Sequence, residues 1–232
     1  MKELLTEGFA ALGVTMHEEA AERLETYWRM LEEKNRVMNL TAITAKEEVA
    51  RQHFLDCGAL LAQADFHQKR VIDIGSGAGF PGLVLKILDP SIELTMLDSL
   101  GMRVEFQKEA VAALALTGVH CINGRAEEQG ELRGSFDLAT ARAVARLNML
   151  AELCLPFVKK GGCFVAMKGP AAVEELQEAK HAISVLGGTA LGVKEYTVPG
   201  TDLHHSAVLI RKSGVTPPQY PRRWAKIKQS PL

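Results

Sequence analysis

The sequence lacks several features that would place it in a specialised class. Its longest uninterrupted apolar run covers residues 110–116, far short of the ~20 residues that a membrane-spanning helix needs. It has four scattered cysteines and no CxxC pair, which argues against a zinc site and against a disulfide framework. The N-terminus carries Glu3 and Glu7 and no long apolar segment, so we expect no secretory signal. These absences favour a cytoplasmic globular protein with no metal and no membrane partner.

No charge of one sign dominates the chain either. The 232 residues have a formal net charge of −1, so the protein has no overall basic character of the kind that marks many nucleic-acid-binding proteins. The distribution is uneven, because residues 213–232 contain four basic side chains and no acidic one. Such a basic tail could bind phosphates, or it could be a solvated chain end.

The chain divides into three parts by its hydrophobic pattern. Residues 1–68 read as a helical extension, with Thr-x-x-Glu capping boxes at Thr15–Glu18 and Thr44–Glu47 predicting two helix starts. No linker-like segment follows, so we expect this extension to pack on the core. The core is expected to span residues 69–212, and residues 213–232 form the basic tail.

Short apolar runs alternate with helix-length segments in the core. The last two runs are joined by a turn-rich loop instead of a helix, which predicts an antiparallel pair. The alternation predicts an α/β fold with a doubly wound, mostly parallel, seven-stranded sheet. The predicted strands cover residues 71–74, 93–97, 119–122, 136–140, 163–167, 189–198 and 206–212.

A glycine-rich turn directly follows the first predicted strand. Gly75, Gly77 and Gly79 stand at alternate positions after Asp73, and a helix is expected to follow. Glycine lets the backbone turn sharply and approach a ligand closely, and the helix N-terminus offers free N–H groups. Asp98 ends the next strand, where a carboxylate can accept hydrogen bonds from ribose hydroxyls. Together these residues predict a nucleoside-cofactor site.

The turn alone leaves two cofactors open. Its glycines satisfy the dinucleotide fingerprint, so an NAD-dependent oxidoreductase is one reading. Three features favour S-adenosylmethionine: the acidic-x-Gly-x-Gly-x-Gly spacing, the lack of room for a second catalytic domain, and the antiparallel strand pair at the end of the sheet. The spacing resembles that of class I methyltransferases.

Further motifs extend this resemblance over nearly the whole chain. The sequence resembles the glucose-inhibited division protein B (GidB) family, bacterial methyltransferases that modify guanine N7 in 16S ribosomal RNA of the small subunit. The segments that carry the resemblance, in chain order, are residues 39–43, 53–56, 73–82, 97–99 with Arg103, 125–127, 136–137, 141–144, 168–169 and 220–223. The sequence departs from the family pattern at Met102, Ala225 and Ile227, where the family usually has Lys, Gly and Pro.

The resemblance implies functional residues as well as a fold. It implies that S-adenosylmethionine contacts Gly75, Phe80, Ala126, Glu127 and Arg142, with Asp98 at the ribose. Arg142 is also the catalytic candidate, because an arginine can read the acceptor edge of guanine. Phosphate contacts to RNA are expected from Lys168, Arg222 and Arg223, although a solvated Lys168 is nearly as plausible.

The expected reaction needs little acid–base chemistry. Guanine N7 has a lone pair and loses no proton when it attacks a methyl group, so no general base is required. Its edge lies in the deep groove of A-form RNA, so the target nucleotide should be unpaired. Methylation of a small molecule or a protein stays open as an alternative, because the fold does not choose the acceptor.

We expect a monomer whose partner is small-subunit ribosomal RNA or a ribosomal particle. His53 is expected to be a core histidine, and Trp224 is a candidate for stacking on a base.

Overall fold

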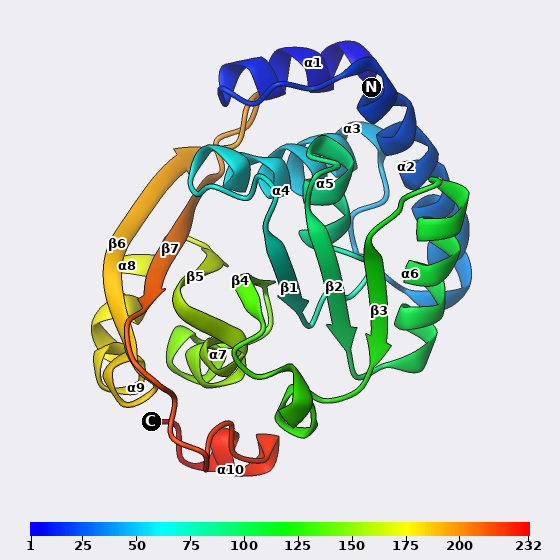
Figure 1. The fold of residues 1–232 in the computed structure, drawn as a ribbon. Coiled ribbons are helices and arrows are strands. Elements are labelled where there is room, and N and C mark those ends of the chain that lie inside the picture. The colour runs from blue at the N-terminus through cyan, green and yellow to red at the C-terminus, as the bar shows by residue number, and fades with distance from the viewer.

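The computed structural model describes residues 1–232 and contains one seven-stranded sheet (Figure 1). The strand order is β3-β2-β1-β4-β5-β7-β6. The strands are β1 (Arg70–Ile74), β2 (Glu93–Asp98), β3 (Val119–Asn123), β4 (Phe136–Arg142), β5 (Val158–Lys168), β6 (Gly188–Thr197) and β7 (His204–Lys212). The predicted fold class is confirmed, and β5 begins five residues before the predicted strand.

The pairing directions follow from the connections between the strands. The first five strands are parallel, since a helical segment separates each from the next. β7 runs antiparallel to β5, and β6 runs antiparallel to β7, as the loop between them predicted. The chain winds outward from β1 to β3 and then returns to place β4 on the other side of β1. The carboxyl ends of β1 and β4 therefore form a topological switch point, where α/β sheets bind ligands.

Helices cover both faces of the sheet, because successive strand residues point to opposite sides. Val71, Leu94 and Val165 pack in one core with the helices of the N-terminal half, whereas Ile72 and Phe164 pack in a second core with the C-terminal helices. The first layer contains α1 (Lys2–Ala11), α2 (Glu18–Met38), α3 (Lys46–Val49), α4 (Asp56–Gly58), α5 (Gly82–Leu88) and α6 (Gly101–Ala113). The second contains α7 (Leu147–Cys154), α8 (Ala172–Glu178), α9 (Lys180–Val185) and α10 (Trp224–Gln229).

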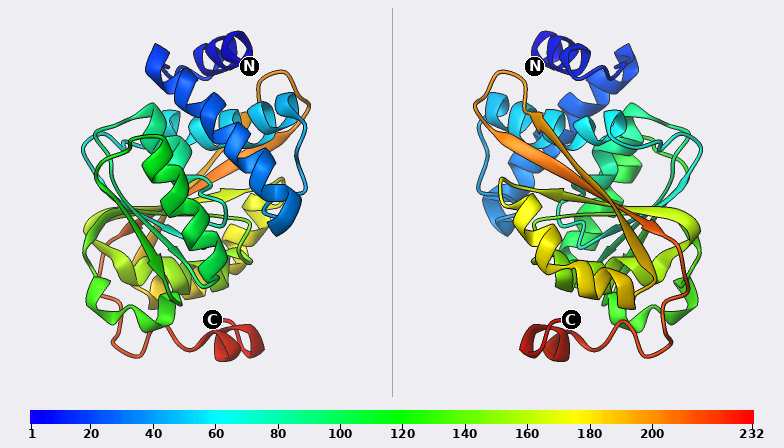
Figure 2. Two further views of the ribbon diagram at one scale, coloured as in Figure 1. Left: turned by 90° about the vertical axis from the view of Figure 1, so that its right-hand side faces the viewer. Right: turned by 90° about the vertical axis from the view of Figure 1, so that its left-hand side faces the viewer.

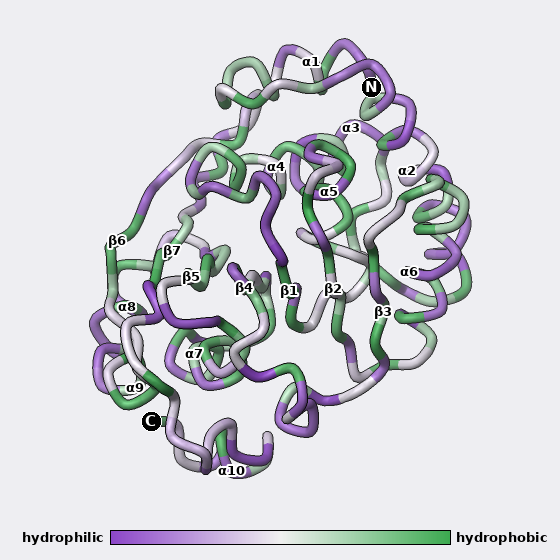
Figure 3. The backbone as a smooth tube through the Cα atoms, viewed as in Figure 1, coloured by the Kyte–Doolittle hydropathy of each residue, from purple (hydrophilic) through white to green (hydrophobic).

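The hydropathy of the chain matches this layering. In Figure 3 the surface helix α6 carries both hydrophobic and hydrophilic segments, as expected for a helix with one buried face. The views in Figure 2 place the two termini at opposite ends of the molecule, with α1 at one end and α10 at the other. None of the helices combines the length and hydrophobicity required to traverse a bilayer.

Both predicted capping boxes are wrong. α2 begins at Glu18 with His17 as its N-cap, and α3 begins at Lys46 after Ala45, with no side-chain cap at either start. Acidic residues in the first turn of each helix favour these later starts through the helix dipole.

The second predicted helix is not a regular α-helix. Residues 46–62 form one helical segment that includes a π-helical stretch, Ala50–Leu55, and ends in a 3₁₀ turn, Ala59–Ala62. π-helical turns are rare and occur often at functional sites. This stretch brings Gln52 and His53 to the carboxyl edge of the sheet.

The basic tail folds back onto the molecule. Ile227 of α10 is fully buried in the second core, and the Arg133 side chain donates hydrogen bonds to carbonyl groups of Thr216 and Tyr220. The tail is therefore an ordered element of the fold.

Candidate cofactor site

A cavity of about 510 Å³ opens at the topological switch point. It lies at the carboxyl ends of β1, β2 and β4 and combines carboxylates with apolar groups, among them Ile74, Leu97 and Leu153. Its volume and mixed lining are those of a small-molecule site. Of the predicted cofactor contacts, the structure brings these to the cavity wall: Gly75, Gly77, Phe80, Asp98, Ala126, Glu127 and Arg142.

The glycine turn takes the backbone conformations that its sequence predicts. Gly75, Gly77 and Gly79 have φ angles of +69°, +57° and +107°, a region that side chains disfavour. Gly79 nevertheless does not line the cavity, unlike the other two. A Cβ atom there would lie 2.5 Å from Leu83 Cδ1 and 2.9 Å from the Tyr27 hydroxyl. Gly79 thus allows close packing inside the protein and is not part of the cavity wall, so its role as a cofactor contact stays a prediction.

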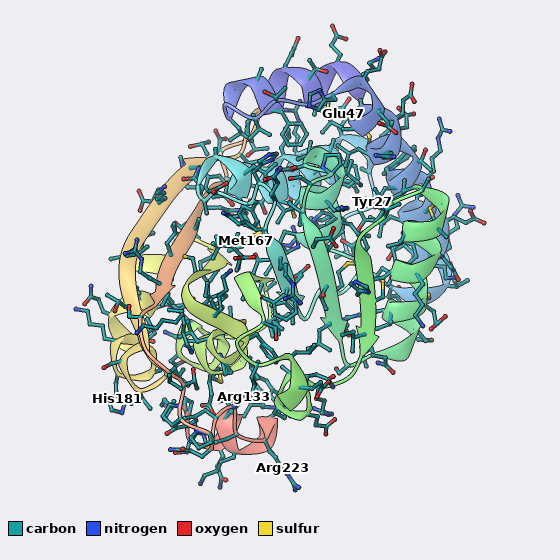
Figure 4. All side chains as sticks on the ribbon, in the orientation of Figure 1. Tyr27, Glu47, Arg133, Met167, His181 and Arg223 are labelled. Atoms are coloured by element: carbon teal, nitrogen blue, oxygen red, sulfur yellow. The ribbon has the colours of Figure 1, made fainter.

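Side chains from other elements hold the turn in place. The buried Tyr27 hydroxyl of α2 donates to the Ala78 carbonyl at 2.6 Å. The buried Gln107 amide of α6 donates to Ser76 Oγ at 2.9 Å and to the Gly77 carbonyl at 2.8 Å. Figure 4 shows Tyr27 inside the first helical layer.

Asp73 supports the turn from below. Its Oδ2 accepts the Gly82 N–H at 2.9 Å, at the start of α5, whereas its Oδ1 is buried with no partner. Burial raises the pKa of Asp73 to about 7. The acidic residue that begins the glycine motif therefore acts on the protein's own backbone.

Asp98 orders the same turn from β2. Its Oδ2 accepts the Gly77 N–H at 2.8 Å and its Oδ1 accepts the Leu100 N–H at 2.9 Å, while Arg103 Nη1 lies 3.7 Å from Oδ2. Each carboxylate oxygen can accept more than one hydrogen bond, so lone pairs stay available to a ligand. Asp98 is thus a part of the cavity wall that can still accept hydroxyl groups.

The tail helix closes one side of the cavity. Trp224 of α10 lines it, and the Trp224 backbone N–H donates to Glu127 Oε1 at 3.0 Å. On the outside of α10, Arg125, Arg223 and Lys228 line a separate groove beside Trp224. The sequence placed Glu127 and Trp224 97 residues apart and gave no signal that they meet.

Arg142, at the end of β4, lies between aromatic and anionic groups. Its guanidinium carbon lies 4.8 Å from the centre of the Phe80 ring, and the His53 ring stacks on the same Phe80 ring with 4.5 Å between centroids. Arg142 Nη1 lies 3.4 Å from the Gln52 carbonyl oxygen and 3.7 Å from Asp56 Oδ2. Burial, helped by the charge of Arg142, lowers the pKa of His53 to about 4, so His53 is neutral near pH 7.

Two of the three predicted RNA contacts have internal partners. Lys168 Nζ is largely buried and lies 2.6 Å from the Ala145 carbonyl oxygen and 2.7 Å from Glu175 Oε2. Arg222 forms an ion pair with the fully buried Glu152, with 2.6 Å between Nη2 and Oε2. Only Arg223 is exposed, and Figure 4 shows it extending outward beside α10.

Comparison with solved structures identifies the fold. The YcgJ protein from Bacillus subtilis has a TM-score of 0.53 at 17% identity, over 70% of this chain and 100% of that chain. A predicted O-methyltransferase from Agrobacterium tumefaciens has a TM-score of 0.52 at 18% identity, over 66% of this chain and 78% of that chain. TYW2 from M. jannaschii in complex with AdoMet has a TM-score of 0.51 at 13% identity, over 64% of this chain and 71% of that chain. The fold is that of the class I S-adenosylmethionine-dependent methyltransferases.

Sequence comparison identifies the family within this class. The family model GidB, rRNA small subunit methyltransferase G, matches residues 20–203. A protein named ribosomal RNA small subunit methyltransferase G from Alkaliphilus metalliredigens is 46% identical over 100% of this chain and 98% of its own length. One of the same name from Clostridium perfringens strain SM101 is 42% identical over 99% and 98%. The chain belongs to the GidB family.

Proposed function

We propose that this protein transfers a methyl group from S-adenosylmethionine to N7 of a guanine in small-subunit ribosomal RNA. One observation carries the proposal: the glycine turn, Asp98 and Arg142 meet in a single cavity, in a chain that matches ribosomal RNA methyltransferases over its full length. A ribosomal substrate would place the protein in the cytoplasm.

The cavity fits a charged sulfur nucleoside. The carboxylates of Asp98 and Glu127 can accept hydrogen bonds from hydroxyl or amino groups, and Glu127 Oε2 makes no hydrogen bond within the protein. The apolar groups of Leu97 and Ala126 offer a surface to an aromatic base. When bound there, S-adenosylmethionine supplies a methyl group on an activated leaving group.

The protein's own task is orientation. Methyl transfer is an in-line displacement, so acceleration comes from holding the nucleophile in line with the carbon–sulfur bond. In this proposal Arg142 donates hydrogen bonds to guanine O6, which leaves the N7 lone pair free to attack. The neutral His53 beside it adds no positive charge where the purine becomes cationic.

The surface around α10 is the proposed RNA-binding face. Arg125, Arg223 and Lys228 are exposed along the groove beside Trp224, which provides a ring for stacking at the rim of the cavity. Lys168 and Arg222 have internal partners, so we propose structural roles for them.

The test uses small ribosomal subunits from cells that lack this enzyme. The protein is incubated with them and S-adenosylmethionine labelled with tritium in its methyl group, and the RNA is digested to nucleosides. We expect label in 7-methylguanosine at one position. Label in another nucleoside contradicts the N7 assignment, and label only in small molecules or protein from a cell extract supports the alternative acceptor. Tight NADH binding without S-adenosylmethionine binding would overturn the whole assignment.

A further inference from the structure

A second cavity, also of about 510 Å³, adjoins the cofactor cavity. The two share His53, Arg142 and Ala143 in their walls. The second cavity lies at the ends of β5 and β7, where Met167 and His205 face it, on the side of Arg142 away from Asp98. Figure 4 labels Met167, near the end of β5, close to the middle of the molecule. The arrangement gives one arginine access to both cavities.

An in-line methyl transfer suits such a pair of cavities. In an in-line transfer the nucleophile approaches the methyl group from the side opposite the sulfur, so the acceptor cannot share the cofactor's own space. The acceptor must enter a neighbouring cavity that meets the first at the methyl group. The wall formed by Arg142 is where these two cavities meet.

The polar groups of the second cavity complement guanine. The guanidinium of Arg142 donates hydrogen bonds, which suits the O6 acceptor of guanine and opposes the amino group that adenine has in that position. Glu175 uses Oε2 for its contacts with Lys168 and with the Leu147 N–H, at 2.7 Å and 2.8 Å. Its Oε1 has no hydrogen bond in the protein and can accept from the N1–H and amino group of guanine.

Arg142 itself is oriented by a network that reaches to the far edge of the sheet. Asp56 is buried, and its Oδ1 accepts hydrogen bonds from Tyr196 Oη of β6 at 2.9 Å and His205 Nδ1 of β7 at 2.8 Å. Its Oδ2 faces Arg142 at 3.7 Å. The hydrogen bond to Asp56 raises the pKa of His205. Asp56 directly follows the π-helical stretch that contains Gln52, the other polar neighbour of Arg142.

We propose that the second cavity receives the target guanine in an unpaired conformation, and that Asp56 and His205 are positioning residues that set the direction of Arg142 toward it. This proposal rests on the proposed function. Asp56 and His205 belong to the N-terminal extension and to the last strand, so elements outside the glycine-turn half of the sheet determine which base is accepted.

Kinetics with unmethylated small subunits test the positioning role. Asp56→Asn puts an amino group opposite Arg142, and we expect kcat to fall about 10²-fold, as for small misplacements of reacting groups, with S-adenosylmethionine affinity unchanged within twofold. His205→Ala should lower kcat at least tenfold, and His205→Asn, whose amide can still donate to Asp56, should recover most of that loss. The matched control is His204→Ala, because His204 is exposed and bonds to Thr197 instead.

Two kinetic outcomes would overturn the proposal. One is a parental kcat for folded Asp56→Asn and His205→Ala. The other is a loss of cofactor affinity equal to the loss of kcat, which would assign both residues to the cofactor cavity.

A binding measurement decides the cavity independently of methylation. The protein saturated with S-adenosylhomocysteine is titrated with GMP while the imidazole signals of its histidines are followed by NMR, with His205→Asn used for assignment. We expect GMP, and not AMP, to shift the signals of His53 and His205. No shift with GMP, or equal shifts with AMP, would overturn the proposal. If the parent protein labels no small subunits and GMP still shifts these signals, the proposed function fails while the guanine cavity stands.

Discussion

Two neighbouring arginines in the tail allow one sharp prediction. Arg222 donates from its backbone N–H and from Nε to Glu152 Oε1, both at 2.8 Å, and from Nη2 to Oε2 at 2.6 Å. Glu152 lies on α7 with no exposed surface. Arg223, the next residue, is exposed and has no such partner. We expect Arg222→Ala to destabilise the protein and Arg223→Ala to leave its stability unchanged.

The magnitude follows from the burial of Glu152. Removing one partner of a buried ion pair costs about 3–5 kcal/mol, because the other charge is left unpaired in the interior. The Arg222 side chain is 20% exposed, and its backbone N–H still donates after the substitution. We therefore expect the lower end, about 3 kcal/mol. For a chain of this size that lowers the melting temperature by about 6–12 °C.

Urea denaturation of the two single variants measures the effect. Arg223→Ala should stay within about 0.5 kcal/mol of the parent, as surface substitutions usually do. Adding Glu152→Gln to Arg222→Ala removes the unpaired charge and should restore part of the stability. For RNA binding we expect the opposite, with the larger effect from Arg223→Ala and the smaller from Arg222→Ala. Arg223→Ala should reduce the salt dependence of the binding constant by about 0.7–0.9 in logarithmic slope, the value of one phosphate contact.

Two results would refute this reasoning. An unchanged unfolding midpoint for Arg222→Ala would mean that the ion pair with Glu152 does not anchor the tail. An equal loss of salt dependence for Arg222→Ala and Arg223→Ala, with stability retained, would restore Arg222 as the phosphate contact that the sequence predicts.

Three further predictions concern the glycine turn. Gly79→Ala should strongly destabilise the protein in thermal unfolding, because the added Cβ would meet Leu83. Gly77→Ala should lower the free energy of unfolding by only about 1–2 kcal/mol, the cost of its left-handed conformation. Its main effect should be weaker binding of S-adenosylmethionine in calorimetry. Between pH 3.8 and about 7 the Asp73 carboxyl keeps its proton in the folded state, whereas the unfolded chain releases it. The parent should therefore lose stability relative to Asp73→Asn as the pH rises through this window. Parallel profiles of urea-unfolding free energy against pH for the two proteins would contradict this. Tyr27→Phe leaves a buried carbonyl without its donor and should lower the free energy of unfolding by about 1–3 kcal/mol; an unchanged value would show that the hydrogen bond contributes nothing.

The fold was predictable because its signals are local. The apolar runs marked all seven strands, and the absence of a helix between the last two marked their antiparallel pairing. The helix starts were not predictable in the same way. Thr15 and Thr44 have capping-box spacing, yet neither caps a helix, because a local pattern competes with the acidic first turns and with packing.

The site was predictable only in part. Gly75 and Gly77 follow β1 and Asp98 ends β2, and the fold places these two strands side by side, so their convergence could be expected. The partners of Lys168 and Arg222 could not be predicted from the sequence. Glu152, for example, has the sequence pattern of an ordinary exposed carboxylate on a helix, and it is buried only because α10 covers it. The same holds for Asp56, whose hydrogen-bond partner His205 lies 149 residues away in the sequence.

The sequence by itself determined the doubly wound sheet, the glycine turn and the acid that ends β2, because strand periodicity and backbone freedom depend on neighbouring residues. Only the tertiary structure decided which polar side chains have internal partners and which face a cavity. An ion pair or a cavity wall is made of groups far apart along the chain, and their meeting depends on how the helical layers and the tail pack on the sheet.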